Sequence, residues 1–198
     1  MNEKNFIEVN GIRFETIVPK RVLTLPKKDI LQKLSYIGKY LSKPPLHPSP
    51  GYPVEIGIRI TNNRDRPLYF SFNFALFPEI IRVENGKNIL FEGGWFHPEQ
   101  PLQSDFYVTM PGESTSFFID AKICWLCGNN YGLSIDFNGG EFIFKPLRLG
   151  RYKLRLIYHN QTDKNWFYDS VNKQTQVIEG LWIGRVLTPF VEIDLVRQ

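Results

Sequence analysis

Two cysteines stand three positions apart in Cys124-Trp125-Leu126-Cys127, the one motif of the chain with reactive potential. Two thiols at this spacing can close a redox disulfide or supply two ligands to a metal. The redox motif works at a helix N-terminus, whereas this pair follows a strand-like run. A structural zinc site needs four ligands, and the chain has no second cysteine pair. The pattern favours ordinary buried or turn-proximal cysteines, and free, oxidised and metal-bound forms all stay open.

The other residue types that perform chemistry are scattered. His47, His97 and His159 lie in no nucleophile or metal signature, so long-range folding alone could join them to the cysteines. The oxygen-rich run from Asp136 to Glu141 breaks the spacing of a calcium loop after its third position, and a hairpin turn explains it better. We therefore predict no catalytic residue, no metal site and no cofactor.

Three adjacent aromatic residues, Trp166, Phe167 and Tyr168, are the candidate ligand-binding residues. They lie in a polar stretch that we interpret as a loop. Exposed aromatics of this kind stack on sugar rings or anchor a protein partner. The competing interpretation is a loop that folds its aromatics under the edge of the domain.

Composition predicts a globular body. A chain of 198 residues with 42% hydrophobic and 15% aromatic residues is long enough to bury a proper core. The net charge is +4, and residues 1–53 hold nine Lys/Arg against four Asp/Glu, so residues 54–198 carry −1. A near-neutral body lacks the clustered cations that phosphate binding needs, and we expect no nucleic-acid partner.

Targeting signals are absent from the sequence. The N-terminus has no apolar signal region, and no stretch approaches the roughly 18 apolar residues of a membrane span. Two cysteines give no disulfide framework, which agrees with a reducing compartment. We expect a soluble, cytoplasmic protein.

Strand signals run along most of the chain. Apolar residues alternate with polar ones over 54–61 and again over 69–74, and the polar turn 62–67 between them predicts an antiparallel strand pair. Turn residues between apolar runs predict further hairpins at Asn10-Gly11, Asn85-Gly86, Pro111-Gly112-Glu113-Ser114 and Asn138-Gly139-Gly140. Alternation returns over 151–158 and 191–195. This spacing is typical of a β-sandwich.

One segment reads differently. Apolar residues at helical spacing over 28–41 predict a single short helix, and five prolines between Pro44 and Pro53 predict a stiff connector. We therefore predict an all-β, immunoglobulin-like antiparallel β-sandwich at 54–198. Residues 1–53 would add an N-terminal hairpin, the helix and the connector.

The order of these signals over residues 54–158 resembles a known family. An alternating strand, the Asn62–Pro67 turn, a Phe-rich strand, an Asn-Gly hairpin, Pro111-Gly112-Glu113-Ser114 and Leu149-Gly150-Arg151-Tyr152 follow one another. This order is similar to immunoglobulin-like domains of the intracellular proteinase inhibitor (BsuPI) type. The resemblance implies a sandwich fold and an inhibitor-like activity.

Taken together, the residues favour a non-enzymatic module that binds a protein partner of unknown identity through Trp166, Phe167 and Tyr168. The alternative is a carbohydrate-binding module, which needs exposed aromatics in a row. An enzyme ranks third, because the sequence offers no set of acid, base and nucleophile.

Overall fold

The computed structural model describes residues 5–25, 51–96, 100–126, 130–137, 140–169 and 171–197. Regular structure in these ranges is β-strand apart from one turn of 3-10 helix, η1 (Gln103–Asp105). None of the helical structure in the described ranges is long and apolar enough to cross a membrane. The predicted all-β fold is confirmed. The helix predicted over 28–41 and residues 44–50 of the predicted proline connector lie outside the described residues, whereas the end of the connector, Tyr52–Pro53, is a short strand.

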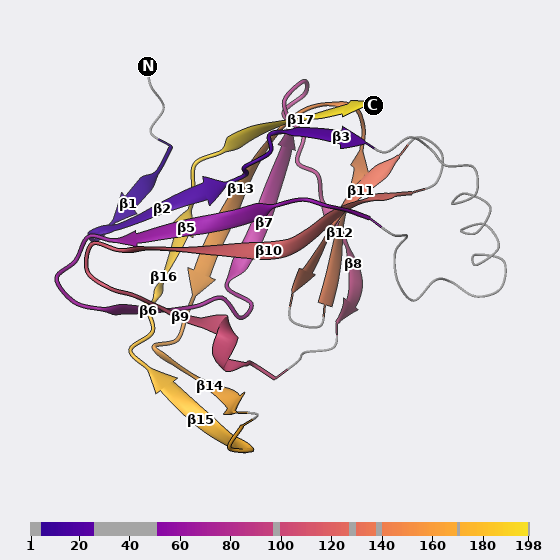
Figure 1. Cartoon of the computed structure of the whole chain (residues 1–198). Coiled ribbons are helices and arrows are strands. Elements are labelled where there is room, and N and C mark those ends of the chain that lie inside the picture. The colour runs from indigo at the N-terminus through magenta and orange to yellow at the C-terminus, as the bar shows by residue number, and fades with distance from the viewer. Residues whose placement is uncertain are drawn as a thin grey trace.

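The larger sheet has eight strands in the described chain, ordered β1-β2-β5-β10-β11-β12-β8, with β4 paired to β10 (Figure 1). These strands are β1 (Ile7–Val9), β2 (Ile12–Ile17), β4 (Tyr52–Pro53), β5 (Ile56–Asn62), β8 (Phe91–Phe96), β10 (Ser114–Trp125), β11 (Tyr131–Phe137) and β12 (Gly140–Leu147). The hairpins predicted at Asn10-Gly11 and around 138–140 are confirmed, because β1 pairs with β2 and β11 pairs with β12. Asn10 and Gly11 both have positive φ, as a tight two-residue turn requires.

The second sheet has five strands, ordered β16-β13-β17-β3, with β7 paired to β13. They are β3 (Val22–Leu25), β7 (Leu76–Arg82), β13 (Gly150–Asn160), β16 (Gly184–Leu187) and β17 (Val191–Arg197). All their pairings are antiparallel except β17 with β3. The alternation predicted over 151–158 is confirmed, since every second side chain of β13 from Tyr152 to Tyr158 is fully buried.

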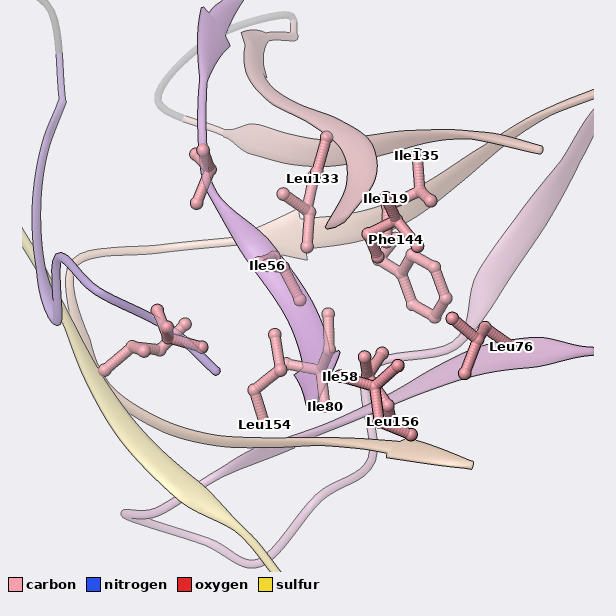
Figure 2. Packing of buried hydrophobic residues seen from close by; sticks show 14 of the residues in the cluster. Ile56, Ile58, Leu76, Ile80, Ile119, Leu133, Ile135, Phe144, Leu154 and Leu156 are labelled. Carbon is pink, nitrogen blue, oxygen red and sulfur yellow. The ribbon is translucent and has the colours of Figure 1, made fainter. Parts of the chain in front are cut away.

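Apolar side chains from both sheets meet in one core. In Figure 2, Ile56 and Ile58 of the larger sheet approach Ile80 and Leu154 of the smaller one. Aromatic rings continue this contact, because the centroids of Phe14 on β2 and Tyr158 on β13 lie 6.1 Å apart. The two sheets are thus layers of a sandwich held by mutual burial of their inner faces.

The N-terminal hairpin belongs to the same layers. β2 pairs with β5 over six residues, from Ile12 with Asn62 to Ile17 with Gly57, and β3 pairs with β17. Ile12 and Phe14 are fully buried in the shared core. The described part of residues 1–53 therefore supplies strands to both sheets.

The strand pair predicted over 54–74 is wrong in its pairing. β5 pairs with β2 and β10, whereas β6 (Leu68–Ser71) pairs with β9 (Phe106–Thr109). The physical reason lies at Asn62, whose buried side-chain amide donates to the carbonyls of Arg66 (2.8 Å) and Thr109 (2.9 Å). Its side-chain oxygen accepts from Arg64 N at 3.0 Å. These bonds shape a turn that leads the chain out of the sheet.

The hairpin predicted at residues 111–114 is also wrong, because β9 pairs with β6 while β10 pairs with β5. The turns at 62–67 and 111–114 are hydrogen-bonded to each other: Gly112 N donates to Asn62 O at 2.7 Å, and Asn62 N donates to Glu113 O at 2.9 Å. The hairpin predicted at Asn85-Gly86 forms close to its turn, where Arg82 N donates to Lys87 O and Ile81 bridges antiparallel to Asn88. Further along, β8 pairs with β12 instead of with β7.

Candidate functional site

The candidate aromatic residues lie on a strand, and the loop interpretation of residues 165–169 is wrong. β14 (Lys164–Asp169) pairs antiparallel with β15 (Gln174–Glu179) to form a separate two-stranded sheet. This hairpin extends away from the sandwich at one end of the molecule (Figure 1). The polar residues on either side of the aromatics belong to β14 itself and to the turn of the hairpin.

Strand geometry separates the three aromatics, because successive side chains point to opposite faces. Trp166 is 44% exposed and stands directly opposite Val177, which is 64% exposed. Tyr168 shares that face and is opposite Thr175. Phe167 points the other way, is buried, and its ring centroid lies 5.8 Å from that of Phe106. The outer face of the hairpin, defined by Trp166, Tyr168, Thr175 and Val177, is thus its exposed apolar surface.

Backbone and side-chain bonds join the base of the hairpin to the sandwich. Asn160, at the end of β13, donates from its side-chain amide to the carbonyls of Thr162 and Trp182, both at 2.8 Å. Leu181 N donates to Asp163 O at 2.8 Å, and Trp182 N donates to Tyr69 O at 2.8 Å. The two chain ends of the hairpin are therefore fixed to each other and to β6.

The far end of the hairpin is ordered by one carboxylate. Asp169 Oδ1 accepts from Val171 N at 2.9 Å and Asn172 N at 3.1 Å. Its Oδ2 accepts from the side-chain amides of Asn172 (2.7 Å) and Gln176 (2.8 Å). The bonds from Asn172, above all that from its side chain, and the bond from Val171 N lower the pKa of Asp169. The turn keeps its shape because four donors converge on this anion.

One edge of the hairpin contacts a neighbouring segment. Tyr168 N donates to Pro101 O at 2.9 Å, and Tyr168 forms an isolated parallel bridge with Leu102. Leu102 is itself 47% exposed. The edge of β14 is therefore partly paired, and apolar exposure continues from the outer face onto residue 102.

Sequence reasoning missed Val177, Asp169 and Asn172. The signal was available, since an Asp followed three residues later by Asn is a turn pattern, and Thr175 and Val177 then alternate with glutamines. Three consecutive aromatics hide the two-residue period of β14.

The residues that could do chemistry do not come together. Cys124 is buried, its thiol lies 3.5 Å from Gly132 O, and burial raises its pKa. His159 Nε2 lies 3.2 Å from the Gln161 side-chain nitrogen. Cys127, His47 and His97 lie outside the described residues. Among the residues that are described, no three His, Cys, Asp or Glu side chains form a group able to hold a metal ion.

The solvent face of the smaller sheet carries cations that are paired with acids. Arg155 lies 2.6 Å from Glu79 across β13 and β7, and Arg151 lies 3.2 Å from Asp194 across β13 and β17. Lys153 also approaches Glu192 at 3.9 Å. A surface of neutralised pairs attracts phosphates weakly, unlike a stripe of free cations.

No family model, curated protein or solved structure matches the chain. The resemblance to the proteinase-inhibitor family, and with it the immunoglobulin-like topology, therefore stays a prediction.

Proposed function

We propose that the chain is a non-enzymatic protein-binding module whose contact surface is the outer face of the β14–β15 hairpin. The observation that carries the proposal is the exposure of Trp166 directly opposite Val177 on a hairpin that projects from the sandwich. Tryptophan is the residue type most enriched at the energetic centres of protein interfaces. Exposed apolar side chains that adjoin on one surface, unlike those scattered singly, mark interaction sites.

Preorganisation supports the same surface. Phe167 packs against Phe106 under the hairpin, while the Asp169 bonds fix the turn at its other end. Because its backbone is already ordered, the hairpin loses little conformational entropy when a partner docks. The proposal assigns no turnover to the chain, and a cytoplasmic location remains part of it.

Affinity capture from the native host, with the full chain as bait, tests the proposal. Trp166→Ala should weaken capture of the partner by about 2 kcal/mol or more. Phe77→Ala is the matched control, since Phe77 is also 44% exposed but lies on β7. Equal capture by the wild type and both variants contradicts the proposal.

Carbohydrate binding is the second candidate. Trp166 and Tyr168 share the outer face two residues apart, which is the arrangement that stacking on successive sugar rings needs. Binding to an oligosaccharide array that Trp166→Ala abolishes would favour this candidate over a protein partner. The family resemblance adds proteinases as one class of protein partner, and inhibition at stoichiometric concentration tests that class.

A further inference from the structure

The outer edge of β15 is an open strand edge. In the part of the chain that the structure describes, β15 pairs with β14 alone, from Gln174 with Asp169 to Glu179 with Lys164. Backbone N–H and C=O groups at alternate residues of β15 therefore face away from β14 without a strand to bond. Such an edge is a template for a further strand.

Most of β15 lacks the features that normally protect an edge, and its one charged residue is Glu179 at the end of the strand. Monomeric proteins place lysine, proline or a bulge in their edge strands. The stretch from Gln174 to Ile178 contains no charge and no proline, and its pairing with β14 has no bulge. Thr175, Val177 and Ile178 also favour extended structure. These features favour the pairing of a further strand with this edge.

The charges at the two ends of β15 identify the occupant. Lys173 is the last residue of the turn and has positive φ, Glu179 ends the strand opposite Lys164 of β14, and the side chains of Lys173 and Glu179 are exposed. An antiparallel copy of the same strand reverses this order, so that the basic end of one copy lies beside the acidic end of the other. The edge is thus complementary in charge to itself.

Symmetry then selects a register. A two-fold axis perpendicular to the sheet keeps the outer faces of both hairpins on the same side of the four-stranded sheet. At the axis, one residue of β15 stands opposite the same residue of the second copy. Centring on Gln176 brings Lys173, at the end of the turn, beside Glu179 of the second copy, and the same contact occurs twice. Centring on Val177 would instead place Glu179 opposite Thr175. Charge complementarity favours the first register.

We propose that two copies of this chain associate through antiparallel pairing of their β15 strands, centred on Gln176, to form a four-stranded sheet. In that sheet one row of neighbouring side chains runs from Trp166 and Val177 of one copy to Thr175 and Tyr168 of the other. The outer faces of the two hairpins merge into one surface with two tryptophans. Because this association needs no other protein, it goes beyond the proposed function.

The expected dimer is weak. Five paired residues on each side bury far less than the roughly 1,600 Å² of a standard interface. Sedimentation equilibrium of the purified full chain from about 10 µM to about 1 mM should show a monomer giving way to a dimer. Amide exchange at alternate residues of β15 should slow as the dimer forms.

Charge reversal tests the register. Lys173→Glu places two acids at each end of the paired strands, and Glu179→Lys places two bases there, so each variant alone should dimerise about tenfold more weakly. An equimolar mixture of these two variants restores opposite charges at both ends and should dimerise like the wild type. Lys87→Glu makes the same charge change on an exposed turn far along the chain and should leave association unchanged.

Three results would overturn the proposal. One is a chain that stays monomeric over the whole range, which would leave the edge to a strand of another protein. A second is a dimer whose affinity is unchanged by both charge reversals. The third is an equimolar mixture of the two variants that does not regain the dimer affinity of the wild type. Partner capture is measured separately with Trp166→Ala, so a failure here and a failure of the proposed function are distinguishable.

Discussion

The side-chain hydroxyls of Thr16 and Thr188 lie 2.5 Å apart in the buried interface between the two sheets. Thr16 is on β2, and Thr188 follows β16, 172 positions further along the chain. Thr188 Oγ1 also accepts from Leu156 N at 3.0 Å and donates to Leu156 O at 2.8 Å. The hydroxyl of Thr16 lies 3.0 Å from the carbonyl of Pro189. This polar contact joins the layers inside an apolar core.

Replacing Thr188 should cost more than replacing Thr16. Thr188→Val keeps the shape of the side chain but leaves Leu156 N and the Thr16 hydroxyl without this acceptor, so we expect a loss of about 1–3 kcal/mol in the free energy of unfolding. Thr16→Val leaves the Leu156 bonds intact and should cost about 1 kcal/mol or less. Urea denaturation of both single variants and the double variant checks this. Strictly additive losses would contradict a direct interaction between the hydroxyls.

The two faces of β14 should respond differently to truncation. Phe167 is 6% exposed and packs on Phe106, so Phe167→Ala should destabilise the hairpin by about 3 kcal/mol or more. Trp166→Ala removes a side chain on the exposed face of the hairpin and should change stability by about 0.5 kcal/mol or less. Denaturation curves of the two variants provide the comparison. A large loss for Trp166→Ala would place this side chain in the core and remove it from the binding surface.

Acid should loosen the turn of the hairpin. Hydrogen bonds from Asn172 hold the pKa of Asp169 in the folded chain below its unfolded value. The stabilisation is therefore fully present above the unfolded pKa and is lost as the pH falls through the lowered folded value. Amide exchange at Val171 and Asn172 should accelerate as the pH drops below about 4, after correction for the intrinsic pH dependence of exchange. Asp169→Asn should remove this acid transition while exchange in β13 stays unchanged.

Cys124 should behave as a buried, unreactive thiol. Burial is the largest cause of its raised pKa, followed by the negative charge of Glu141, so the thiolate is scarce at neutral pH. In a Cys127→Ser background, the native chain should react with a thiol reagent much more slowly than the unfolded chain. Rapid labelling at pH 7 would show that this thiol is activated.

We also expect both cysteines to be dispensable for folding. Replacement of Cys124 and Cys127 by alanine should leave the fold intact and release no stoichiometric zinc, with a loss of stability below about 4 kcal/mol. Metal analysis of the purified chain and a denaturation curve measure these two quantities. Zinc bound by the wild type and absent from the variant would contradict this prediction.

The sequence alone determined where most strands lie and which way their side chains point. The two-residue period over 151–158 marks the buried face of β13, because burial on one face of a strand requires that period. Asn10-Gly11 marks its hairpin because few other residue pairs adopt positive φ at both positions. These features are local, so a single sequence carries them, and they were enough to predict an all-β sandwich.

The tertiary structure alone decided which strands pair and which aromatic side chain meets the solvent. The bonds from Asn62 to Arg66 and Thr109 separate β5 from β6, and the acceptor on Thr109 is 47 positions away. The exposure of Trp166 depends on the packing of Phe167 against Phe106, another contact between distant segments. Alternation identifies a face of a strand but never its partner, because pairing is set by contacts that exist only after the chain has folded.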